Sequence, residues 1–319
     1  MSDPSYRLPP FEYEFPSTQE VARSPLRRQR TWLHLLLLVL TAVTTLAVGA
    51  QLAFNYAHNL PAFDLERNLN PFSVVWGHPE RLLTGLPFSL TLLGILLAHE
   101  MGHYLTCRYY GIAASYPYFI PAPTIIGTMG AFIRIREPIV SRRALFDIGI
   151  SGPLVGFSVA LPVLLVGIAF SRIVPAMHYP GTLTLGNPLL VRFLEHLYYP
   201  GVGEHNIYLH PIARAAWVGL FATALNLIPI GQLDGGHILY AIIGEKHRLL
   251  SRLFLLGLLP LGYLFWYGWL MWATLLFFLG MRHPVLFDPL PLDRRRRWMG
   301  AIALAIFLLC FTPAPFIAH

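Results

Sequence analysis

Long apolar runs constrain this chain more than any other feature of its sequence. Crossing a hydrocarbon core of about 30 Å takes roughly 20 apolar residues in a helix. Seven runs of approximately this kind occur in the 319 residues, and they lie at 32–54, 83–107, 145–171, 209–229, 249–266, 267–281 and 299–317. The sequence therefore predicts an all-α polytopic membrane protein with about seven transmembrane helices.

Composition and charge agree with a membrane protein. Hydrophobic residues make up 55% of the chain and charged residues 12%, and the mean hydropathy is +0.55, which excludes an ordinary water-soluble globule. The arginines behind the formal charge of +7 gather at 23–30, 142–143 and 294–297, each next to an apolar run. This placement indicates the lipid bilayer with its anionic headgroups as a partner, and not nucleic acid. With only two cysteines, the chain has no disulfide framework and no cysteine-rich zinc ribbon.

The distribution of basic residues predicts the orientation of the chain in the membrane. Residues 1–31 contain prolines, acids and a late cluster of arginines, so we expect a disordered cytoplasmic tail followed by a transmembrane domain at 32–319. The stretch 108–143 carries five arginines against one glutamate and is expected in the cytoplasm as well. These features predict a multi-pass protein of the bacterial inner membrane with its N-terminus inside.

The run at 249–281 needs separate treatment. As one helix it would be roughly 50 Å long, which exceeds the hydrocarbon core. Pro260, Gly262 and the tryptophans at 266–269 favour a break. Two short spans would also keep Arg294–Arg297 in the cytoplasm, although the sequence leaves one span open as the alternative.

The second apolar run contains the motif H-E-x-x-H at residues 99–103. In a helix His99 and His103 lie about 40° apart around the axis and about 6 Å apart along it, so both imidazoles can bind one Zn²⁺. Glu100 points elsewhere, and it is the candidate general base for a water molecule at the metal. Such groups inside a lipid-spanning helix usually mark a functional site. Histidines that only bond to neighbouring helices are the alternative.

Asp234 is the candidate third ligand, because a catalytic zinc usually has three protein ligands. It follows the helix-breaking Pro229 and Gly231 and stands among apolar residues. Both His103 and Asp234 come at or just after the inner end of a run that crosses from outside to inside, so we expect them on the cytoplasmic side. A helix N-cap is the other role that Asp234 could have.

Other polar residues lie near these motifs. Asn226, eight residues before Asp234, is a candidate for binding a substrate carbonyl or the developing oxyanion, with a bond between helices as the alternative. His237 is expected either behind the metal ligands or facing water, and Cys107 as a buried, inert thiol. Asp147 is expected to pair with Arg143, four residues earlier.

The small residues Gly149, Gly152, Pro153 and Gly156 are expected to form a close-packing helix face. The stretch 115–138 predicts a different structure. It is too polar and proline-rich to cross the membrane and too apolar for a loop, so we expect a small re-entrant β-hairpin. Gly127 and Gly130 would bracket its turn, and the alternation at 132–136 predicts a strand. That strand could pair with an unwound substrate segment, or it could only pack.

Taken together, His99-Glu100-Met101-Gly102-His103 and the stretch Asn226–Gly235 resemble the motifs of the site-2 protease family. The similarity extends from Gly94 to about Gly244 and includes 127–137 and 151–153. The resemblance implies a catalytic core at about 83–244 and zinc held by His99, His103 and Asp234. It further implies Glu100 as the base and a transmembrane protein as the substrate.

The same resemblance maps the family's membrane-embedded hairpin onto 115–137. The loop 172–208 is too short for the PDZ domain that many members carry, so bacterial and plastid members without one are the most similar.

Two other functions remain open from the residues alone. A proteolytically inactive scaffold could use the same fold. A membrane di-iron desaturase or hydroxylase could use a generic H-x-x-x-H box, but such enzymes need many more histidines, and no His-His pair occurs in the chain. Neither the substrate nor the oligomeric state follows from the sequence.

Overall fold

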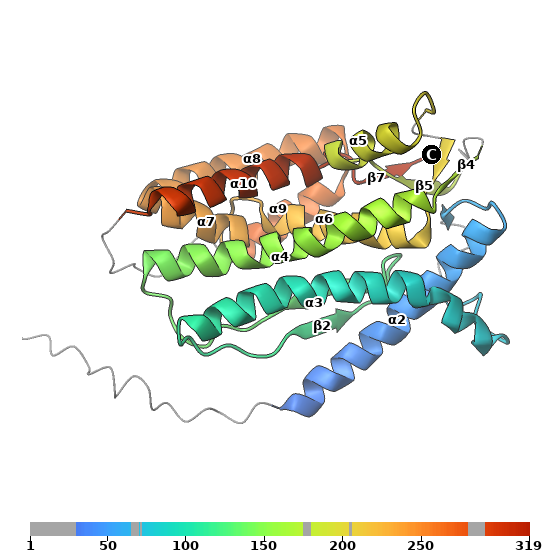
Figure 1. The fold of residues 1–319 in the computed structure, drawn as a ribbon. Coiled ribbons are helices and arrows are strands. Elements are labelled where there is room, and N and C mark those ends of the chain that lie inside the picture. The colour runs from blue at the N-terminus through green and yellow to red at the C-terminus, as the bar shows by residue number, and fades with distance from the viewer. Residues whose placement is uncertain (1–29, 65–69, 71, 175–179, 204–205, 280–290) are drawn as a thin grey trace, which may run out of the picture. The chain divides into compact units, whose positions relative to one another are not determined.

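A computed structural model describes residues 30–64, 70, 72–174, 180–203, 206–279 and 291–319. Contacts divide the chain into Met1–Thr31 and Trp32–His319. Apart from its last two residues, the predicted disordered tail at 1–31 lies outside the described residues. The second unit is mostly helical, as predicted (Figure 1).

Three helical segments are long and apolar enough to cross a membrane among the residues that the structure describes. They are α2 (Thr31–Ala57), the 3₁₀ helix η1 (Pro79–Gly85) that runs into α3 (Leu86–Tyr109), and α4 (Arg142–Ala169). They coincide with the predicted runs at 32–54, 83–107 and 145–171. Large apolar side chains such as Leu35 and Val39 on α2 are 62% and 58% exposed, as lipid-facing residues would be. The chain is therefore an integral membrane protein.

The other predicted runs form shorter helices. In chain order the remaining helices are α5 (Leu189–Tyr198), α6 (Pro211–Asn226), α7 (Asp234–Ile243), the 3₁₀ helix η3 (Gly244–Lys246), α8 (His247–Leu264), α9 (Gly268–Leu279) and α10 (Arg294–Cys310). The run at 249–281 forms two helices, α8 and α9, as predicted. The break comes after Leu264, whereas Pro260 lies inside α8. A Cβ on Gly262 would lie 2.6 Å from the Leu270 side chain, so glycine lets the two helices fold closely together.

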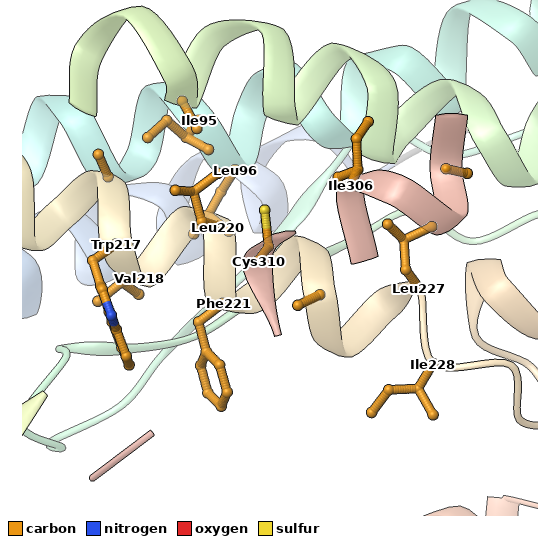
Figure 2. Packing of buried hydrophobic residues seen from close by; sticks show 14 of the residues in the cluster. Ile95, Leu96, Trp217, Val218, Leu220, Phe221, Leu227, Ile228, Ile306 and Cys310 are labelled. Carbon is orange, nitrogen blue, oxygen red and sulfur yellow. The ribbon is translucent and has the colours of Figure 1, made fainter. Parts of the chain in front are cut away.

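Helix α6 forms the centre of the helical core, because it is apolar on nearly all sides. It packs against α3, α4 and α10, and α3 and α4 run side by side (Figure 1). Figure 2 shows Ile95 and Leu96 of α3 close to Leu220 of α6, with Ile306 and Cys310 of α10 beside them. The close packing of α6 against α3 depends on a small residue, since a Cβ on Gly219 of α6 would be 2.7 Å from Ile95 of α3.

A β-hairpin lies in the stretch where one was predicted, but its second strand comes earlier in the sequence than predicted. Strands β2 (Tyr118–Pro121) and β3 (Thr128–Phe132) pair antiparallel with a bulge between Phe119 and Pro121. Gly127 ends the turn with φ +84°, whereas Gly130 lies inside β3 and does not bracket the turn. Beyond β3 the alternating stretch pairs only through an isolated bridge between Ala114 and Ile135.

The hairpin lies against two helices. On α2, the Thr44 hydroxyl donates a 2.6 Å hydrogen bond to the Gly127 carbonyl, and His34 Nδ1 lies 3.2 Å from the Pro117 carbonyl. Strand β3 also contacts α3, which carries the H-E-x-x-H motif. The hairpin is therefore covered by protein on the side of these helices.

Two further small sheets were not predicted, because strands of two to four residues are too short to show an alternating pattern. One joins β1 (Phe63–Asp64), β5 (Thr182–Leu185) and β7 (Phe316–Ala318) in the order β1-β5-β7. The other pairs β4 (Arg172–Ile173) with β6 (Ile207–Tyr208). Together with α5 they cover the end of the bundle opposite to the start of α4 (Figure 1).

The predicted partner of Asp147 was wrong. Asp147 accepts hydrogen bonds from Arg296 Nε at 2.8 Å and Nη2 at 2.6 Å, and from the Tyr110 hydroxyl at 2.5 Å. Burial and the bond to Asp147 raise the pKa of Tyr110. The local spacing favoured Arg143, but a planar guanidinium approaching from α10 makes two parallel bonds and prevails. This cluster joins the cytoplasm-facing ends predicted for α3, α4 and α10.

Candidate metal centre

Three predicted ligands meet at one point between α3 and α7. His99 Nε2 and His103 Nε2 lie 3.2 Å apart, and Asp234 Oδ2 lies 3.3 Å from the first and 3.2 Å from the second. Zinc bonds of about 2.0–2.1 Å at tetrahedral angles put neighbouring ligand atoms about 3.3 Å apart. The three atoms therefore already have the spacing of one face of a zinc tetrahedron.

Helix α4 holds His103 in one tautomer. The Ile148 carbonyl can only accept a hydrogen bond, so His103 Nδ1–H donates to it at 2.7 Å, and in the neutral imidazole Nε2 keeps its lone pair toward Asp234. A backbone carbonyl that orients a histidine in this way is a common support for a metal ligand. This carbonyl could not be predicted from the sequence, since every residue has one.

The glycine face of α4 packs against the two imidazoles. A Cβ on Gly152 would lie 2.1 Å from His103 Nε2, and one on Gly156 would lie 3.1 Å from His99 Nδ1. The predicted packing role of these glycines is confirmed, and their partners are the ligand side chains themselves. The two histidines and the two glycines are both four residues apart, and this matching spacing was the signal in the sequence that could have indicated their contact.

Asp234 is held by a tightly folded loop at the start of α7. The Cβ of a larger residue at Gly235 would be 2.1 Å from the Leu227 carbonyl oxygen, so the loop leaves no room for a side chain there. The N-cap of α7 is Leu233 and not Asp234, so the N-cap alternative is wrong. Asp234 Oδ2 is buried and accepts no well-formed hydrogen bond from the described residues, which suits an oxygen that binds a metal.

Glu100 and Asn226 border this group. The Glu100 side chain is buried beside the histidines, and its carboxylate lies near the backbone of Ile133, just after β3. Asn226, the last residue of α6, has its amide nitrogen 3.2 Å from His99 Nε2. Both predicted residues therefore lie at the site together with the three ligands.

Two other candidates lie outside the ligand group. His237 is one turn after Asp234, and its Cβ packs toward Gly149. Cys107 is fully buried in the core. Within the described part of the chain, His99, His103 and Asp234 form the one group of three ligands, so nothing there supports the second metal that a di-iron enzyme needs.

Comparisons with known proteins extend over this region. Residues 87–265, more than half of the chain, match the family model described as Peptidase family M50. The chain is 34% identical to "Probable zinc metalloprotease EGY1, chloroplastic" of Arabidopsis thaliana over 56% of this chain and 34% of the relative. It is 33% identical to "Probable zinc metalloprotease EGY2, chloroplastic" of the same plant over 74% of this chain and 43% of the relative.

A third relative is "Probable zinc metalloprotease EGY1, chloroplastic" of Oryza sativa subsp. japonica, with 33% identity over 57% of this chain and 32% of the relative. The chain thus spans about a third to two fifths of the length of these curated relatives. All the residues of the metal centre lie inside the matched region 87–265.

Proposed function

The chain belongs to peptidase family M50, the site-2 protease family that its motifs resemble, and on this premise we propose that it is an intramembrane zinc endopeptidase. Its substrates are other membrane proteins, which it cleaves in or near a transmembrane helix. The observation that carries the proposal is the triangle of ligand atoms, with edges of 3.2–3.3 Å, that His99, His103 and Asp234 form in an apolar helix bundle. An inactive scaffold would not need this geometry.

The residues of the triangle and those around it have different roles in peptide hydrolysis. His99, His103 and Asp234 would hold the zinc ion, which when bound polarises the scissile carbonyl and acidifies a water molecule. Glu100 takes a proton from the attacking water and returns it to the leaving amine. The Asn226 amide donates to the substrate carbonyl oxygen, where negative charge develops.

The hairpin at 115–137 would present the substrate. A peptide bond inside a helix is shielded by its own hydrogen bonds, so the substrate has to unwind before cleavage. An unwound segment can pair with the edge of β2 or β3 as an added strand. The closeness of Glu100 to the Ile133 backbone supports this role, because the end of β3 then lies beside the proposed base.

We propose seven crossings with the N-terminus and the active-site side in the cytoplasm. The three long helices supply three crossings, and α6, α8, α9 and α10 supply the other four. The distribution of arginines supports this orientation, with Arg294, Arg295 and Arg297 exposed at the start of α10. The membrane that we propose is the bacterial inner membrane, although the named relatives are chloroplast proteins. Reporter fusions after Ala57 and after Tyr110 should report opposite sides.

The decisive experiment compares Glu100→Gln with the wild-type chain. The variant should keep about one zinc per chain and lose about 10²- to 10⁴-fold in cleavage of a transmembrane-helix substrate, because a general base is removed without touching a ligand. Glu80→Gln, an exposed glutamate on η1, is the matched control and should cleave normally. Cleavage by Glu100→Gln at the wild-type rate would reject the assignment of the base.

Loss of metal tests the proposal independently. Dialysis against a strong chelator should abolish cleavage, and stoichiometric Zn²⁺ should restore it. A wild-type chain that holds zinc but cleaves no membrane-helix substrate would favour the scaffold function instead.

A further inference from the structure

A cavity of about 430 Å³ lies at the opposite end of α6 from Asn226. Its lining comes from β5, α5, the first turn of α6 and the stretch between α10 and β7. Arg214, which lines it, is twelve residues before Asn226, or about 18 Å along the helix. The cavity is thus separate from the metal centre, and proteolysis as proposed above does not use it.

A buried guanidinium opens into this cavity. Arg214 is 8% exposed, its Nε donates to the Leu209 carbonyl at 3.1 Å, and its guanidinium carbon lies 5.0 Å from the centre of the Tyr208 ring. Among the residues that the structure describes, no carboxylate forms an ion pair with Arg214. Its two terminal nitrogens therefore have donors to offer a ligand in the cavity.

The charges around the cavity favour an anion. Arg192 and Arg214 line it together with one acid, Glu195, whose Oε2 accepts a 2.7 Å hydrogen bond from the Asn187 amide. Glu195 also attracts Arg214 electrostatically. Because a buried positive charge without an anionic partner is costly, an anionic group that bonds to the terminal nitrogens of Arg214 would be strongly favoured.

The surface beside the cavity has the character of a membrane interface. Leu189, Phe193 and Leu197 repeat every four residues on α5 and are 58%, 64% and 63% exposed, so α5 presents an apolar stripe outward. Leu189 belongs both to this stripe and to the cavity lining. The cavity is therefore continuous with a surface suited to lipid.

Exposed aromatic residues also lie close to the cavity. Phe265 lines the cavity from the turn between α8 and α9, and its neighbours Tyr263 and Tyr267 are 77% and 72% exposed. Exposed tyrosines are typical of the layer where headgroups meet the hydrocarbon core. The guanidinium of Arg214 would thus lie at the depth of lipid phosphates.

We propose that this cavity binds the phosphate group of an anionic phospholipid. Arg214 bonds to the phosphate oxygens, and the acyl chains lie along the apolar stripe Leu189, Phe193 and Leu197. A bound lipid would link α5 to the first turn of α6. A peptide carboxylate would use Arg214 as well, but it would not need the exposed stripe.

The test uses the full chain in mild detergent, with phosphatidylglycerol added and bound lipid counted by native mass spectrometry. Arg214→Gln removes the cation. Leu189→Trp narrows the entrance of the cavity and leaves the cation in place. Arg214→Gln should weaken phosphatidylglycerol retention about 10- to 100-fold, the range expected for loss of a charge-assisted hydrogen bond, and Leu189→Trp should weaken it as well because the larger side chain obstructs the entrance. Arg252→Gln and Leu253→Trp, both on the exposed surface of α8 and outside the cavity lining, are the matched controls and should retain the lipid.

Zinc content and thermal unfolding show whether each variant is folded. If Arg214→Gln misfolds, the lipid retention of Leu189→Trp decides whether the proposal holds. Unchanged lipid retention in the folded variants would overturn the proposal. Displacement of the lipid by an equal concentration of inorganic phosphate would also overturn it, because the site would then take the free anion.

Discussion

Replacing Gly152 by alanine should disable the metal centre without altering any ligand. Gly152 lies on α4 directly against the His103 ring, and a Cβ there would be 2.1 Å from Nε2 and 2.5 Å from both adjacent ring carbons. Ordinary van der Waals contact begins at 3.4 Å, so the ring has to move by about 1.3 Å, the difference between 3.4 and 2.1 Å. The Ile148 carbonyl, bonded to Nδ1 at 2.7 Å, resists this movement.

The magnitude follows from how little displacement a metal ligand tolerates. Distances in a zinc site vary by about 0.2 Å, several times less than the required shift. Loss of a supporting contact alone typically costs about 10- to 100-fold in metal affinity, and loss of a ligand costs more. We therefore expect Gly152→Ala to weaken zinc binding at least 100-fold and to abolish cleavage.

Two matched glycine variants make the comparison sharp. Gly156→Ala places a Cβ 3.1 Å from His99 Nδ1, which requires a shift of only a few tenths of an ångström, so zinc affinity should fall less than tenfold. Gly94→Ala, on the same helix as the histidines, meets nothing within 4 Å and should bind zinc normally. The assay is competition for Zn²⁺ against a chelator of known affinity, with thermal unfolding measured in parallel. If Gly152→Ala binds zinc as tightly as Gly94→Ala, the steric reasoning is wrong.

Three further variants test other parts of the site and fold. Asp234→Asn should lower zinc retention after dialysis about tenfold or more, since an amide is a poorer ligand than a carboxylate; full retention would remove Asp234 from the ligand set. Arg296→Lys keeps the charge but loses the two parallel bonds to Asp147, so the melting temperature should fall by about 2–4 °C with unchanged zinc content, and an unchanged melting temperature would contradict this. Gly235→Ala would put a Cβ 2.1 Å from the Leu227 carbonyl, so both zinc content and melting temperature should drop, whereas loss of neither would contradict the loop geometry.

The ligands were predictable because their signals are local or come from well-defined chemistry. His99 and His103 are four residues apart in an apolar run, and helix geometry alone brings their imidazoles to one side. Asp234 followed from the need for a third ligand and from the topology of the runs. The break between α8 and α9 followed from helix length, although Pro260 proved compatible with the helix interior.

The wrong and missed predictions concern features that depend on residues far away in the sequence or on very short elements. Asp147 pairs with Arg296, 149 residues later, and no spacing rule reaches across that distance. The alternation at 132–136 was real, but register is set by the facing strand, and β2 pairs with 128–132. Helix α5 was missed because its apolar stripe is only ten residues long and lies between short strands.

An intact H-E-x-x-H motif with a later aspartate does not by itself specify a working metal centre. Helix α4 supplies no ligand, yet it provides the carbonyl of Ile148 that fixes the His103 tautomer and the empty spaces at Gly152 and Gly156 that the imidazoles fill. A carbonyl is available at every residue, but an empty space is available only where the side chain is missing. Of what α4 contributes to the centre, the glycine pair is therefore the part that can be recognised in a sequence. The ligand motif should be interpreted together with this pair.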